Sequence, residues 1–113
     1  MKNTSFGEFR RGEQFLRMMM SASLEEWLEV MKLRAHPSSN FTYADRAGNI
    51  FLIWNAALPL LPHPPVDDLT AVHARGAADV WSKLVPFESL PQFLNPPGGY
   101  VHNENSSPHF SNV

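Results

Sequence analysis

Cysteine is absent from the 113-residue sequence. Its absence excludes disulfide bridges, thiolate nucleophiles and cysteine-ligated metal centres, although it leaves the cellular compartment open. The sequence also has no large excess of either charge. Its 9 Lys and Arg residues and 11 Asp and Glu residues give a net charge of −2. A balance of this kind creates no strong attraction for nucleic acid or for an anionic membrane. We therefore expect neither as a partner.

Long apolar runs are missing as well. No stretch reaches the roughly 18 consecutive apolar residues typical of a membrane-spanning helix. The first residues also lack the basic and then apolar pattern of a signal peptide. We expect no membrane segment and no export signal in this chain, and its localisation is unknown from the sequence.

Proline is absent from the first 36 residues, whereas all 10 prolines lie at or after Pro37. With 43% hydrophobic and 18% charged residues, the composition is that of a folded chain and not of a disordered one. The length allows one domain at most. The sequence predicts a single partial domain over residues 1–113, with a helical part at 8–35, a hairpin at 40–55 and a proline-rich extended and loop region at 56–113.

Two helices are expected in the first part. Ser23 and Glu26 form a capping-box pattern, in which the Ser23 hydroxyl accepts from the Glu26 amide and the Glu26 carboxylate reaches back to the Ser23 amide. The apolar residues that follow recur at helical spacing and form one face: Leu24, Trp27, Leu28 and Met31. Before the cap, Phe15, Leu16 and the methionines at 18–20 indicate another helix, with the methionines expected in the core.

The hairpin has the clearest local signal. β-branched and aromatic residues at 41–43 and 50–54 flank a turn with Asp45 early and Gly48 late. The second strand is apolar on both faces, which is typical of a strand buried between two layers. We expect that so short a chain cannot cover all of residues 51–54, and that it therefore aggregates or needs a partner.

Familiar catalytic and metal-binding motifs are missing. The five histidines show no paired metal-ligand spacing, and Asp67 and Asp68 do not begin a calcium loop. Gly98 and Gly99 are not part of a phosphate-binding loop, and no Gly-x-Ser-x-Gly motif is present. We expect no metal and no cofactor bound to this chain.

The stretch NPPGGYVHNENSSP at 95–108 places two glycines and several amides behind two prolines. If it runs extended from Tyr100, then Val101, Asn103 and Asn105 lie on one face. One reading is that these amides are placed donors in a site. The other is that they make Asx-type turn bonds before Pro108.

Three motifs stand in order: NFTYADRAGNI at 40–50, PFESLP at 86–91 and NPPGGYVHNENSSP at 95–108. Together with the upstream helices they resemble the β-subunit of the penicillin acylase family, which includes acyl-homoserine-lactone and aculeacin acylases. The resemblance extends from about Arg10 to Asn112. It implies an internal fragment of an αββα N-terminal-nucleophile hydrolase, an α+β fold, that cleaves linear amides such as penicillin side chains or N-acyl-homoserine lactones.

In that family a serine freed by self-cleavage attacks the amide, and its own α-amine acts as the base. The resemblance assigns Asn105 as the oxyanion-hole residue that donates its side-chain N–H, and Ser39 as a residue lining the acyl pocket. The nucleophile usually opens the β-subunit within Ser-Asn-x-Trp. Ser39-Asn40 is the nearest match here, but it is too close to Asn105, and removing Met1 would expose only Lys2.

We therefore predict a fragment that is inactive alone. Its partners are the remainder of the acylase polypeptide, namely the α-subunit and the rest of the β-subunit, and a small-molecule amide substrate. Full-length members are periplasmic or secreted, and some carry calcium in a site that is not complete here. The alternative is a small non-catalytic interaction protein that uses the proline-rich stretch 58–66 as a ligand for a partner domain.

Overall fold

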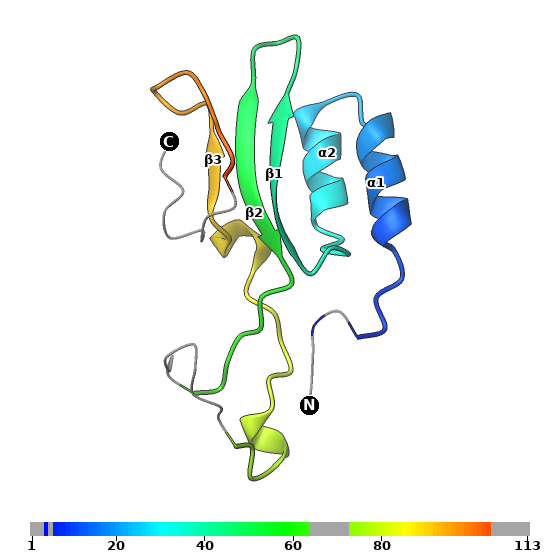
Figure 1. Cartoon of the computed structure of the whole chain (residues 1–113), viewed down its shortest axis with the longest axis vertical. Helices are drawn as coiled ribbons and strands as arrows, with labels where there is room; N and C mark the ends of the chain where they lie inside the picture. The colour runs from blue at the N-terminus through cyan, green and yellow to red at the C-terminus, as the bar shows by residue number, and fades with distance from the viewer. Residues whose placement is uncertain (1–3, 5, 64–72, 105–113) are drawn as a thin grey trace.

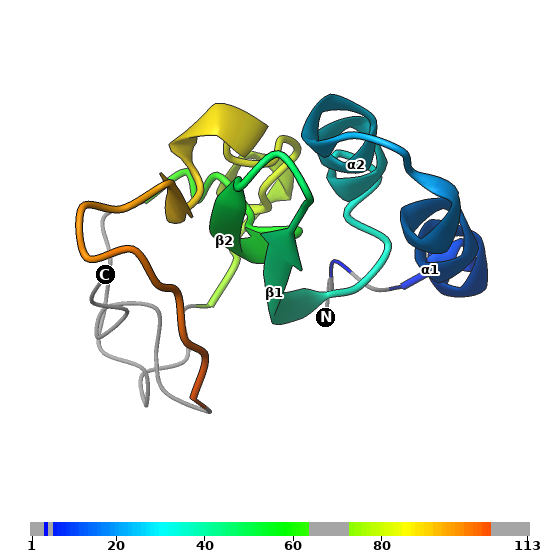
Figure 2. The same cartoon turned by 90° about the horizontal axis from the view of Figure 1, so that it is seen from above.

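The computed structural model describes residues 4, 6–63 and 73–104, and it has an α+β architecture (Figure 1). The elements follow in the order α1 (Arg11–Met20), α2 (Leu24–Met31), β1 (Ser38–Ala44), β2 (Ile50–Ala56) and β3 (Gln92–Leu94), with short 3₁₀ turns at Ala77–Asp79 and Phe87–Ser89. The three strands form one antiparallel sheet in the order β1-β2-β3. Seen from above, both helices lie on one side of this sheet, and the segment after β3 passes along the other side (Figure 2). The predicted α+β class, with two helices followed by a hairpin, is confirmed.

The predicted cap begins α2 in a modified form. The Glu26 amide donates to the Ser23 hydroxyl at 3.2 Å, as expected. The Glu26 carboxylate, however, accepts from the Ala22 amide at 2.8 Å and not from that of Ser23. Both contacts satisfy amides that have no partner within the helix. They stabilise the start of α2 at this point, so that α1 and α2 are separate helices.

The core lies between α2 and the sheet. Trp27, Val30 and Met31 are buried against Phe51 and Ile53 of β2, and Phe87 and Leu90 close the far end. Trp27 meets Phe51 edge-on, with ring centroids 6.1 Å apart, which is a favourable aromatic geometry. The helical spacing predicted from the sequence therefore identifies the packing face of α2.

The hairpin is confirmed, and its turn is held by Asp45. Its backbone amide donates to the Asn49 carbonyl, and its carboxylate accepts from the Asn49 amide at 3.0 Å and from the Asn49 side chain at 2.9 Å. Gly48 has φ +91°, a left-handed value that disfavours residues with a side chain. Phe51, Leu52 and Ile53 are at most 3% exposed, so the chain covers three of the four residues that we did not expect it to cover together. Trp54 is only half-buried.

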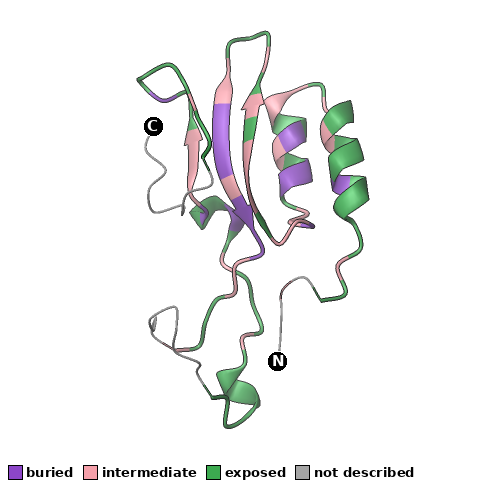
Figure 3. Cartoon of the chain, viewed as in Figure 1, coloured by how far each residue is buried: buried purple, intermediate pink, exposed green. Residues whose placement is uncertain are grey.

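Other large apolar residues are exposed, and several of them lie on α1 or just before it, where most of the chain is exposed (Figure 3). Met19 and Met20 are 83% and 72% exposed, so the expectation that the methionine run fills the core is wrong for both. Within the described chain, α1 packs on α2 and the start of β1 but carries nothing on its outer side, and that side therefore faces solvent. We call the exposed large apolar residues of this region the α1 patch: Phe6, Phe9, Phe15, Leu16, Met19 and Met20.

Candidate functional site

The sheet face opposite the helices carries the candidate site. Along β1 the side chains alternate, so Ser39, Phe41 and Tyr43 face the helices while Asn40 and Thr42 face the other way. Two ring contacts on the helix side agree with this. The ring centroids of Phe41 and Phe15 are 6.1 Å apart, and those of Tyr43 and Trp27 are 5.3 Å apart. The chain after β3 runs across the opposite face (Figure 2).

Asn95 fixes the beginning of that chain segment. Its backbone amide donates to the Ile50 carbonyl at 2.9 Å, and its side-chain oxygen accepts from the Ile50 amide at 2.8 Å. Its side-chain nitrogen donates to Asn49 at 3.1 Å. Asn95 has φ +47°, which asparagine tolerates better than most residues. This anchor was not predicted from the sequence; the signal available was an asparagine placed directly before two prolines and two glycines.

A tight turn then redirects the chain. The Gly99 amide donates to the Pro96 carbonyl at 2.9 Å, and Gly99 has φ +70°. After the turn, the rings of Tyr100 and His102 stack with centroids 5.9 Å apart. The two rings therefore lie on the same side of the segment, in agreement with the predicted alternation from Tyr100.

The segment is tied to β1 by two asparagine side chains. The Asn40 amide nitrogen donates to the Asn103 side-chain oxygen at 2.7 Å. Asn103 therefore holds this segment to a side chain on β1. The Asn40 oxygen is buried and has no hydrogen-bond partner among the described residues.

Neither of the two predicted site residues, Asn105 and Ser39, is seen at the Asn40–Asn103 contact in the described structure. Asn105 lies outside the described residues. Ser39 is half-buried on β1, and its hydroxyl is 3.1 Å from Nδ1 of His36, on the helix side of the sheet. Ser39 therefore lies on the opposite side of the strand from the Asn40–Asn103 contact, and the described structure does not bring the two together.

A shallow groove of about 520 Å³ separates the hairpin from the crossing segment. It is lined by residues 42–44, Ile50 and residues 99–103. At its turn end, the Tyr43 hydroxyl donates to the Asp45 carboxylate at 3.2 Å. Hydrogen bonds from Asn49 hold the pKa of Asp45 below its usual range, whereas desolvation raises the pKa of Tyr43. Asp45 is therefore a carboxylate at neutral pH, and its contacts support the turn.

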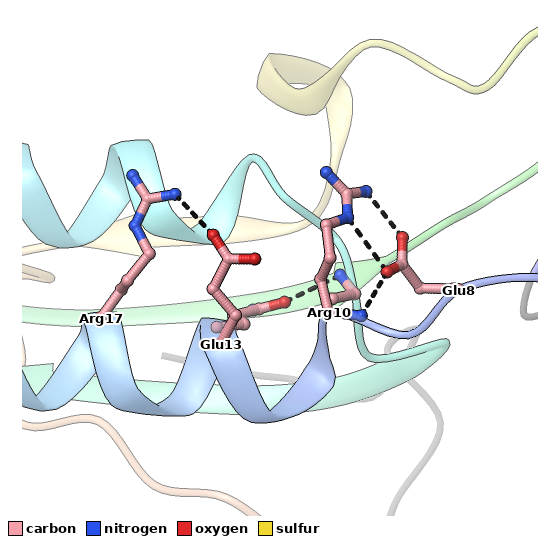
Figure 4. Close-up of polar contacts among 6 residues, drawn as sticks. Glu8, Arg10, Glu13 and Arg17 are labelled. Carbon is pink, nitrogen blue, oxygen red and sulfur yellow. Dashed lines mark hydrogen bonds and ion pairs between the residues drawn. The ribbon is translucent and has the colours of Figure 1, made fainter.

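Ion pairs lie just before α1, on α1 and at the end of α2, where Lys32 pairs with Glu29. Figure 4 shows the first two of them. Glu8 pairs with Arg10 at 2.6 Å, and Glu13 pairs with Arg17 at 3.3 Å. The hydrogen bond from Arg10 lowers the pKa of Glu8 to about 2. Exposed pairs of this kind contribute little to stability, because water and salt screen the charges. In the described part of the chain, no three potential metal ligands gather in one place, and no helix there is long and apolar enough to cross a membrane.

Part of the proline-rich stretch pairs with residues 83–85 of the same chain. The Val85 amide donates to the Leu58 carbonyl, and the Leu60 amide donates to the Lys83 carbonyl, both at 2.9 Å. These contacts place Pro59 opposite Leu84 in an isolated antiparallel bridge. A domain that recognises a free polyproline strand would have to displace this pairing. Residues 64–66 lie outside the described residues.

Comparison with known proteins identifies the family. A profile of the penicillin amidase family matches residues 5–112. Penicillin G acylase from Escherichia coli is 35% identical over 92 residues, which are 80% of this chain but only 10% of that protein. The chain thus spans about a tenth of the length of this relative. On this evidence, the chain belongs to the penicillin amidase family.

Proposed function

We propose that the chain is an internal segment of the β-subunit of an acylase, an N-terminal-nucleophile hydrolase that cleaves linear amides. The observation that carries the proposal is the 35% identity to penicillin G acylase across 80% of this chain. Its substrates are small amides, with penicillin side chains and N-acyl-homoserine lactones as the two classes to test. Antibiotic conversion and quorum quenching are the corresponding roles.

In this proposal Asn105 supplies the oxyanion hole. Its side-chain N–H stabilises the oxygen that becomes negative when the nucleophile attacks the amide. Loss of one such donor raises the barrier by about 2.7–4 kcal/mol. The attacking serine lies in another part of the polypeptide, and its α-amine takes the proton. Ser39 contributes to the wall of the acyl pocket, and its hydroxyl is oriented by His36.

The partner in this proposal is the remainder of the acylase, comprising the α-subunit and the rest of the β-subunit. Two facts support it. The chain corresponds to only 10% of its relative, and the α1 patch exposes six large apolar residues. Contiguous apolar patches of this kind usually mark interaction surfaces. Calcium, where the complete enzyme holds it, binds at a site that is not complete in this chain, and periplasmic or secreted localisation belongs to the complete enzyme.

An acylase assay on three samples tests the proposal: the isolated chain, the complete polypeptide that contains it, and that polypeptide with residues 8–104 deleted. Release of phenylacetate from penicillin G and of fatty acid from an N-acyl-homoserine lactone is measured. Of the three samples, we expect only the complete polypeptide to hydrolyse the substrates. Hydrolysis by the isolated chain, or none by the complete polypeptide with either substrate, would overturn the proposal.

A further inference from the structure

Two amide anchors hold the segment from Asn95 to Glu104 against the hairpin. Asn95 binds Ile50, which pairs with Ala44 at the turn end of the hairpin. Asn103 binds Asn40, four residues further along β1. At about 3.3 Å per residue, the anchors are separated by roughly 13 Å along the strand. The segment is therefore fixed at both ends of this span, and the groove lies between them.

The second anchor depends on one side-chain hydrogen bond. Asn40 is half-buried in β1 and Asn103 is exposed, and 63 residues separate them in the sequence. The buried Asn40 oxygen has no partner among the described residues, so packing alone would favour an apolar side chain at this position. Thr42, the next residue on the same face, is exposed. The contact to Asn103 thus accounts for the amide at position 40.

We infer that Asn40 is a positioning residue: through Asn103 it fixes the chain that leads, two residues later, to Asn105. The role of Asn105 rests on the proposed function, whereas the anchoring by Asn40 does not. An oxyanion donor is effective only if it is held in place before charge develops on the substrate. A misplacement of about 1 Å can cost on the order of 10²-fold in rate.

Two changes at Asn103 test the direction of the hydrogen bond. In Asn103→Asp, the Asn40 N–H still meets an acceptor, so the anchor is kept. In Asn103→Ala, the acceptor is gone, so the anchor is lost. Both changes are made at the same exposed position, which makes the two variants matched controls for each other, and Asn40→Leu removes the donor from the other side of the bond. Thr42→Ala is the control for a change on the same face without an anchor.

The first readout is ¹⁵N relaxation of the backbone amides of residues 101–104 in the 113-residue chain, with the amides of β2 as the internal reference. We expect order parameters near 0.85 in the wild type, Asn103→Asp and Thr42→Ala, and below about 0.6 in Asn103→Ala and Asn40→Leu. If Asn40→Leu disturbs β2 as well, the pair of variants at Asn103 still decides the question. Equal order in Asn103→Asp and Asn103→Ala would overturn the inference.

The second readout is the turnover of the complete acylase. Asn103→Ala should lower kcat by about 10–100-fold with little change in KM, whereas Asn103→Asp should retain kcat. A selective rise in KM, or equal loss in both variants, would contradict positioning. If the complete polypeptide has no acylase activity, the proposed function fails, and the relaxation measurement still decides whether Asn40 anchors the segment.

Discussion

Gln14 is the buried residue of α1, and replacing it should loosen this helix from the rest of the fold. Its side-chain oxygen accepts from the Ala35 amide at 2.7 Å, at a site where both groups are buried. Its side-chain nitrogen makes only a long contact of 3.9 Å with the Met31 sulfur. The bond to Ala35 therefore links α1 directly to the connection between α2 and β1.

Gln14→Met keeps the approximate volume of the side chain and removes the acceptor. The Ala35 amide is then left buried without its partner, which should reduce the free energy of unfolding by about 1–3 kcal/mol. For a chain whose total stability is on the order of 5–15 kcal/mol, this loss is large. Gln14→Ala should cost more, because it also leaves a cavity.

Urea titration followed by tryptophan fluorescence measures these differences, with Trp27 in the core as a reporter. Gln92→Met is the matched control. The Gln92 side chain donates to the Phe87 and Glu88 carbonyls from a half-buried position, where water can replace the lost bonds. We expect a change of less than about 1 kcal/mol there. If Gln14→Met is no less stable than Gln92→Met, the role given to the Gln14–Ala35 bond is refuted.

Three further predictions concern the hairpin and the α1 patch. Gly48→Ala should destabilise the chain by about 1–2 kcal/mol because of its φ of +91°, and a urea titration equal to that of wild type would contradict this. The Asp45 carboxylate has a lowered pKa, so its stabilising effect is present above its usual pKa of 3.8 and is lost as the pH falls below that value. The difference in urea midpoint between wild type and Asp45→Ala should therefore shrink on acidification, and a constant difference would argue against the carboxylate. The double change Leu16→Lys and Met20→Lys should suppress self-association of the isolated chain in light scattering without altering the unfolding midpoint; unchanged association would show that the α1 patch is not responsible.

Sequence patterns predicted the elements whose signals are local. The cap at Ser23 and the Asp-Gly turn of the hairpin depend on side chains within a few residues, and both lie where expected. The burial of α1 could not be predicted in this way, because Phe15, Leu16 and the methionines have a helical pattern that does not specify what covers it. The result is a helix whose buried residue is a glutamine.

The candidate site was predictable only in part. The stretch after Asn95 was singled out by its asparagines, and the motif directed attention to Asn105. The anchors at Ile50 and Asn40 were not predicted, since they join positions 45 and 63 residues apart through individual hydrogen bonds. No composition or periodicity encodes such a pairing. The positive φ of Asn95 likewise becomes evident only once the chain is seen to turn there.

The turnover of the complete acylase with Asn105→Ala tests the central claim most directly. If Asn105 donates to the oxyanion, kcat should fall by about 10²–10³-fold while the enzyme remains folded. Asn112→Ala, which removes an amide from the same stretch outside the motif, should leave kcat unchanged. Wild-type turnover in Asn105→Ala would contradict the account.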